Sequence, residues 1–182
     1  MIRRPPRSTP SNSSAASDVY KRQGSVIVHV RIGRRIHAPL IPLGSADLML
    51  STELAETARY LQYANENTKI ITNTKFIPPA LPGVAEKTEP GKILSWLKSR
   101  VRPENLILVE ASDIASSLGA PQSTNMVILG AATPLLMDYI DIDHLEKRVG
   151  SVGRGRVREL NLEAFRQGMR YVCEHYGLCV RR

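Results

Sequence analysis

His29 and Arg31 are the first side chains along the chain that could bind another molecule. They lie in an apolar stretch, residues 25–32, in which valine or isoleucine recurs at every second position. That period predicts a β-strand and places His29 and Arg31 together on one of its faces. The pattern is equally typical of a solvent-exposed strand face and of an interface.

Asn73 and Thr74 directly follow a predicted strand at 69–72, and Asn125 lies at the start of an apolar helix. Ligands of α/β proteins bind at the carboxyl ends of strands, so Asn73 and Thr74 are candidates for a binding site. The simpler interpretation is that they satisfy backbone groups of the turn at Pro78-Pro79. For Asn125 the simpler interpretation is capping of the helix.

No arrangement of residues in the sequence amounts to an active site by itself. The sequence has no glycine-rich dinucleotide loop, Walker loop, HExxH pair or nucleophile elbow. His37, His144 and His175 have no carboxylate or cysteine at metal-ligand spacing. Five residues separate Cys173 from Cys179, which fits neither a zinc pair nor an iron–sulfur run. We therefore expect no catalytic residue, no metal ligand and two free thiols.

Strands and helices are predicted to alternate along the chain. Nearly continuous apolar runs at 46–50, 69–72 and 106–109 are typical of central strands buried on both faces. Residues 25–32 are expected to form a hairpin with residues 35–40. This order predicts a three-layer, Rossmann-like α/β domain with a mixed, mostly parallel sheet.

Helices are expected between these strands and after the last of them. The first is predicted to begin at Ser51 or Thr52, and the last to be capped by Asn161. Small residues in 124–132 predict a helix that packs closely on the sheet. Further helices are expected from Ser112 or Asp113 to 118 and from Asp141 or Asp143 to 149. Another is expected at 92–101, with Ile93, Leu94, Trp96 and Leu97 facing the core.

Residues 1–23 differ in composition from the rest of the chain. They contain three prolines and five serines and show no apolar period, so we expect a disordered or non-native leader. The segment resembles translated sequencing-adaptor DNA, and a mitochondrial presequence is the alternative. The domain then spans residues 24–182. Because the leader holds five basic residues and one acidic residue, about half of the net charge of +8 belongs to it.

Six short motifs together resemble the gamma domain of the 2-oxoacid:ferredoxin oxidoreductases, in the form found as the beta subunit of indolepyruvate oxidoreductase. They occur in the family's order and cover most of residues 24–170. The motifs are HVRIG from His29, APLIP from Ala38, GSADLML from Gly44, NTKFIPP from Asn73, NMVILGA from Asn125 and ELNLEAF from Glu159.

The resemblance implies a cytoplasmic accessory subunit of an enzyme that oxidatively decarboxylates a 2-oxoacid, with aryl pyruvates favoured. Thiamine diphosphate and [4Fe–4S] clusters would be held by a catalytic alpha subunit, so no cofactor is expected on this chain, which would be inactive alone. Ferredoxin and CoA would act through the complex. Under this reading the candidates for binding substrate or CoA, or for the subunit interface, are His29, Arg31, Asn73, Thr74 and Asn125.

The family's first strand, glycine-rich turn and first helix have no counterpart ahead of Gly24. We therefore expect the first βα unit to be missing from the domain. An open sheet edge exposes backbone donors together with apolar side chains, so such a chain is expected to aggregate.

The alternative function is a small basic module that binds nucleic acid or an acidic protein and has no enzymatic activity. Single-stranded nucleic acid is usually held on aromatic side chains, and the chain has only two Phe and one Trp. No apolar run reaches the roughly 18 residues of a membrane-spanning helix. We therefore expect neither nucleic acid nor a membrane as a partner.

Overall fold

The computed structural model describes residues 25–33, 36–78 and 89–180, so the predicted leader lies outside the described residues. Three strands form a parallel sheet in the order β1 (Ala46–Ser51), β2 (Ala64–Asn73) and β3 (Leu106–Val109). All three predicted strands are thus confirmed, but only β2 is central among the described residues, and Leu50 of β1 is 43% exposed. β2 begins at Ala64 rather than at Lys69, because Ala64 pairs with Ala46 of β1. The Thr68 hydroxyl donates to the Ala46 carbonyl, 2.5 Å away, where the register shifts.

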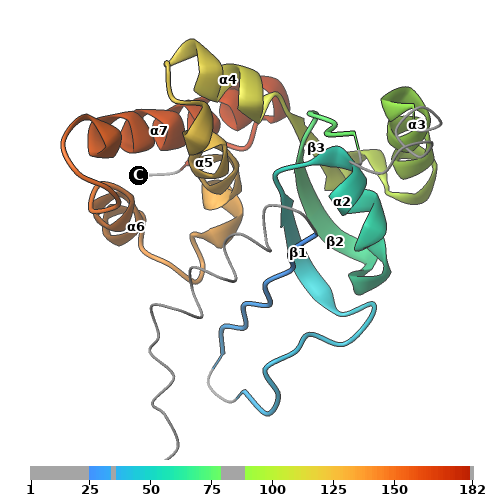
Figure 1. Cartoon of the computed structure of the whole chain (residues 1–182). Coiled ribbons are helices and arrows are strands. Elements are labelled where there is room, and N and C mark those ends of the chain that lie inside the picture. Colours follow the sequence, from blue (N-terminus) through green and yellow to red (C-terminus); the bar gives the residue numbers. More distant parts are fainter. Residues whose placement is uncertain (1–24, 34–35, 79–88, 181–182) are drawn as a thin grey trace, which may run out of the picture.

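Helices cover both faces of this sheet, as Figure 1 shows. On one face lie α2 (Leu54–Arg59) and α3 (Pro90–Arg100). Leu54 and Leu97 of these helices form a buried cluster with Ile70 and Leu106 of the sheet. Burial of each such side chain contributes roughly 1.5–3 kcal/mol to stability.

The opposite face is covered by α4 (Ala111–Ser117), α5 (Thr124–Leu136) and α7 (Arg156–Tyr176), and α6 (Ile142–Val149) lies beside α7. Ile71 points into this second cluster, although its neighbour Ile70 points into the first. Alternate residues of β2 therefore enter different cores, as in a strand buried on both faces. The predicted three-layer, Rossmann-like α/β architecture is confirmed.

α5 and α7 approach each other more closely than ordinary side chains allow. A Cβ on Gly130 would lie 1.9 Å from the Phe165 carbonyl oxygen, and a Cβ on Gly168 would lie 2.0 Å from the Val127 carbonyl oxygen. The small residues of α5 were expected to serve packing on the sheet. The structure shows that the closest of these contacts is with α7.

The predicted hairpin is not formed. Residues 25–33 and 36–43 belong to no strand, and every strand pair among the described residues is parallel. Pro39 and Pro42 lack the N–H that a ladder requires. Side-chain hydrogen bonds connect the two stretches instead. The sheet was expected to be mixed, but its described part is entirely parallel.

Two further expectations fail in the helices. Trp96 was expected to face the core but is 40% exposed, and Leu97 is the buried residue of α3. Asn161 does not begin the last helix, because α7 starts at Arg156. It is instead a buried polar residue, accepting from the Ser123 hydroxyl at 2.7 Å and donating to the Val152 carbonyl at 3.1 Å.

The expectation of two free thiols is wrong, since Cys173 and Cys179 form a disulfide. The reason is the turn that ends α7. Gly177 adopts a left-handed conformation with φ of 68°, which glycine reaches without a steric penalty. The chain therefore folds back, and the two Cα atoms lie 4.3 Å apart. Sequence spacing alone carries no sign of this reversal.

Candidate functional site

Side chains of the amino-terminal segment, residues 25–33 and 36–43, link its two stretches to each other, and His29 also contacts the rest of the domain. The Nδ1 atom of His29 accepts a hydrogen bond from the Ile41 amide at 3.1 Å, and its ring meets Tyr63 edge-on at 5.1 Å. Arg31 donates from Nη1 to the carbonyls of Ala38 at 2.8 Å and Leu40 at 3.3 Å. His29 and Arg31 therefore replace the backbone ladder that the predicted hairpin would have had.

This segment exposes an unusual concentration of large apolar side chains. Val28 and Val30 are 77% and 69% exposed. Monomeric proteins seldom leave such residues contiguous at the surface, and patches of this kind mark interaction sites. The exposed set comprises Val26, Ile27, Val28, Val30, Ile32, Ile36, Leu40 and Leu43.

Asn73 forms a polar cross-link at the carboxyl end of the sheet. It is fully buried, and its amide nitrogen donates to the Thr52 carbonyl at 2.9 Å and to the Ser112 hydroxyl at 2.8 Å. Its Oδ1 accepts from the Ser112 amide at 3.3 Å. Thr74 continues the connection, since its amide donates to the Val109 carbonyl at 3.0 Å. Asn73 thus joins the end of β1 to the start of α4, whereas the simpler sequence interpretation had it serve the Pro78-Pro79 turn.

Glu53 is a charged residue at this same edge whose role the sequence interpretation missed. It replaces the expected Ser51 or Thr52 as the cap of α2, and Oε2 accepts from the Glu56 amide at 2.8 Å. Its second oxygen, Oε1, accepts from the Ile77 amide at 3.1 Å. The carboxylate is nearly buried, and two backbone N–H groups satisfy it. An acidic residue two positions after the end of an apolar strand is the available sequence signal.

The candidate residues do not converge on one site. His29 packs on Tyr63, which precedes β2, whereas Asn73 is the last residue of β2. A strand of ten residues spans about 30 Å, so the two groups lie at opposite ends of the sheet. Asn125 is exposed in the first turn of α5 and accepts from the Met126 amide at 3.0 Å, while Ser123 holds the cap position.

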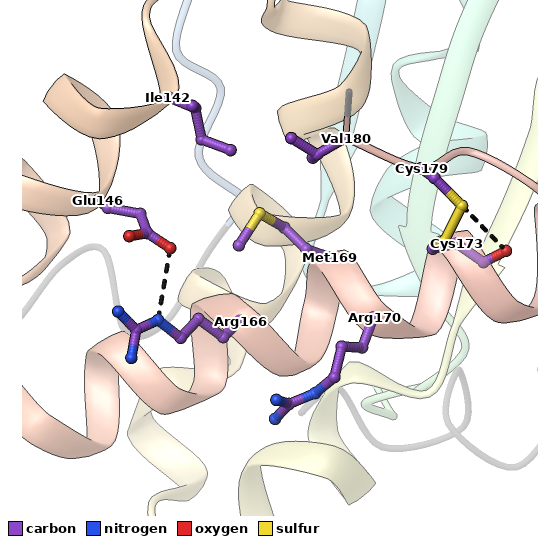
Figure 2. Close-up of a pocket in the computed structure, with 8 residues that line it drawn as sticks. All are labelled: Ile142, Glu146, Arg166, Met169, Arg170, Cys173, Cys179 and Val180. Atoms are coloured by element: carbon purple, nitrogen blue, oxygen red, sulfur yellow. Dashed lines mark hydrogen bonds and ion pairs between the residues drawn. A yellow bond between two sulfur atoms is a disulfide. The ribbon is translucent and has the colours of Figure 1, made fainter. Parts of the chain in front are cut away.

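Two shallow pockets lie between α6 and α7. The first, of about 290 Å³, includes Arg166, Arg170 and the two cysteines in its lining. The second, of about 410 Å³, includes Asp143, Lys147 and Arg158. In the first, Arg166 forms an ion pair with Glu146 at 3.4 Å, shown as a dashed line in Figure 2. None of the five candidate residues lines either pocket.

The pKa values of Tyr171 and Asp141 are shifted from their ordinary values. Burial raises the pKa of the Tyr171 phenol, and the nearby Glu110 charge adds to the effect. The backbone N–H of His144 lowers the pKa of Asp141, the cap of α6. No group of three or more His, Cys, Asp or Glu side chains in the described parts of the chain is arranged to hold a metal ion. Likewise, no helix described there is both long and apolar enough to cross a membrane.

A model of the family described as pyruvate ferredoxin/flavodoxin oxidoreductase matches residues 13–171. The chain belongs to this family. The match includes the whole sheet and most of α7, so the architecture described above is that of a family domain. It also confirms the resemblance seen in the six sequence motifs.

Curated relatives agree with this assignment. The chain is 40% identical over 150 residues to the indolepyruvate oxidoreductase subunit IorB of Archaeoglobus fulgidus, covering 81% of this chain and 73% of the relative. The corresponding subunit of Methanothermobacter thermautotrophicus is 35% identical over 153 residues, with 81% and 75% covered. That of Pyrococcus horikoshii is 29% identical over 161 residues, with 87% and 79% covered.

Proposed function

We propose that this chain is the accessory subunit of a 2-oxoacid:ferredoxin oxidoreductase that acts on an aryl pyruvate such as indolepyruvate. It serves assembly of the complex and has no turnover by itself. The catalytic alpha subunit holds thiamine diphosphate and the [4Fe–4S] clusters. CoA and ferredoxin act on the complex, in the cytoplasm.

The exposed apolar amino-terminal segment is the observation that carries this proposal. Arg31 cross-links this segment internally and His29 contacts Tyr63 of the domain, while Val28 and Val30 are exposed to solvent. Such an ordered, exposed apolar surface is typical of a site that binds a partner. Burying each large apolar side chain against a partner contributes roughly 1.5–3 kcal/mol, so several together hold a stable interface. The chain belongs to an oxidoreductase family, and its curated relatives are named as subunits of indolepyruvate oxidoreductase. We therefore infer that the partner is another subunit of such an enzyme.

The cysteines of the chain support the placement of the clusters on the partner. A [4Fe–4S] cluster is normally held by four cysteine thiolates. This chain has two cysteines, and they form a disulfide with each other. The residues present therefore do not fit a cluster, and no electron-transfer step is assigned to this chain.

The five candidate residues divide into two roles under this proposal. His29 and Arg31 shape the amino-terminal segment for the subunit interface. Asn73 and Thr74 fix the carboxyl edge of the sheet, and Asn125 lies exposed at the start of α5, where substrate, CoA or the partner subunit can reach it.

Reconstitution tests the function directly. The chain and the catalytic subunit are purified separately and assayed with indolepyruvate, CoA, thiamine diphosphate and a viologen acceptor. We expect no turnover by the chain alone and turnover after mixing, with indolepyruvate preferred to pyruvate. Turnover by this chain without a partner would refute the accessory role, and preference for pyruvate would refute the substrate class.

A further inference from the structure

We propose that the Cys173–Cys179 disulfide is a thiol–disulfide exchange site, at which a dithiol reductant opens the bond and frees residues 179–180 from α7. The bond joins the last turn of α7 to the segment after Gly177. Nothing in the proposed assembly role requires such a bond, so this inference stands independently of it.

The bond is accessible from solvent. Cys179 is exposed and Cys173 is half-buried, and both line the pocket of about 290 Å³ between α6 and α7. Figure 2 shows the two sulfurs at the edge of this pocket, with Val180 near Met169. Exchange requires that a thiolate reach a sulfur, and exposed disulfides are the labile ones. A buried structural bond would lack this access.

The disulfide fixes residues 179–180, which make few other contacts among the described residues. Gly177 and Leu178 are fixed without the bond, because their amides donate to Cys173 and Val172 carbonyls, each at 3.1 Å, and Leu178 packs against the core. Beyond them, the Cys179 amide reaches only as far as the Gly177 carbonyl, 3.1 Å away. Among the residues that the structure describes, the disulfide is therefore the main link between α7 and residues 179–180, which line the pocket.

The exchange has two steps. A thiolate of the reductant attacks Sγ of Cys179, the more exposed residue, and Cys173 leaves as a thiolate that takes a proton from water. The second thiol of the reductant, as its thiolate, then attacks the reductant sulfur that is bonded to Cys179. Cys179 leaves as a thiolate and is protonated. The protein gains two thiols, and the dithiol becomes a disulfide.

Alkylation with N-ethylmaleimide tests the bond in the full chain, purified without reductant and kept folded. We expect no adduct before treatment with dithiothreitol and two adducts afterwards. Two adducts before treatment would overturn the proposal, because the bond would be absent. Adducts that require a denaturant as well as dithiothreitol would also overturn it, because the bond would then be structural.

Amide hydrogen exchange tests the consequence of opening. Reduction should accelerate exchange at residues 179–180 by at least about tenfold, with little change in α5. The variant Cys179→Ser should show the fast exchange without reductant, whereas Met169→Leu, which leaves both cysteines in place, should respond to dithiothreitol as the parent does. Unchanged exchange at 179–180 after full reduction would contradict the release of this segment.

Discussion

The phenol oxygen of Tyr176 hydrogen-bonds both backbone groups of Leu108, accepting from the amide at 2.9 Å and donating to the carbonyl at 3.0 Å. Tyr176 is the last residue of α7, and Leu108 lies in β3, at the edge of the described sheet. The Tyr176 side chain thus makes the two hydrogen bonds that the backbone of a neighbouring strand would otherwise make with Leu108. It also ties the carboxyl-terminal helix to the sheet.

Removing the Tyr176 hydroxyl should weaken the attachment of α7 to β3. Tyr176→Phe keeps the ring and loses both hydrogen bonds, so we expect the free energy of unfolding to fall by about 1–2 kcal/mol. Urea denaturation measures the difference. Tyr139→Phe, at a ring that is 65% exposed, is the matched control and should change stability little. Equal midpoints for the two variants would contradict a role for the phenol.

Because α5 and α7 lie so close together, a larger residue at Gly168 should disrupt their packing severely. Gly168→Ala places a methyl group 2.0 Å from the Val127 carbonyl oxygen, so the helices must separate. Overpacking costs roughly 1–3 kcal/mol and more where backbone must move. Gly91→Ala is the control, because a Cβ there meets no atom within 4 Å. Alanine favours the helix, so Gly91→Ala should leave the melting temperature unchanged or raise it. A stable Gly168→Ala would contradict the close approach.

Asn73 and Asn125 give a matched pair of substitutions at a buried and an exposed site. Asn73→Asp removes the donor to Thr52 and Ser112 and buries a charge, so we expect a loss of about 1–3 kcal/mol. Asn125→Asp lies near the positive end of α5 and should be neutral or slightly stabilising. Chemical denaturation of both variants checks this. A cost at Asn125 equal to that at Asn73 would contradict the assigned positions.

Much of the fold was predictable because local signals and burial agreed. The apolar runs that became β1 and β3 have the length of strands, and β3 buries three of its four residues. β1 was also predicted to be buried on both faces, but Ala46 is its one buried residue. Asp141 was predicted as one of two caps for α6, and the structure selects it. These features depend on residues within a few positions of one another.

The errors arose where a distant partner decides the conformation. The alternation in residues 25–32 is typical of a strand, but no neighbouring strand among the described residues supplies a ladder. Asn161 has the chemistry of a cap, yet Ser123, far away in sequence, makes it a buried helix residue. Likewise, the left-handed Gly177 rather than cysteine spacing decides the disulfide.

The Asp141 carboxylate predicts a pH dependence of stability. Hydrogen bonding, first from the His144 amide, holds the folded pKa of Asp141 below its ordinary value of about 3.9. Its stabilisation is therefore complete above about pH 4 and is lost as the pH falls through the lower folded pKa. Asp141→Asn keeps an acceptor for the cap and removes this charge.

Melting temperatures of the parent and of Asp141→Asn, compared at several pH values, provide the test. The parent should be the more stable protein at neutral pH, and the difference should shrink under acid conditions. A difference that is constant or grows toward low pH would contradict the direction of the pKa shift.

The amino-terminal segment as the subunit interface is the central claim, and binding of the purified catalytic subunit tests it most directly. The double variant Val28→Asp/Val30→Asp should weaken binding at least about hundredfold, because two apolar burials of roughly 1.5 kcal/mol or more are lost. Val152→Asp, at an exposed residue outside the segment, should bind as the parent does. Hydrogen exchange of the complex should show protection at residues 25–33. Parent-like affinity of the double variant, with no protection there, would contradict the account.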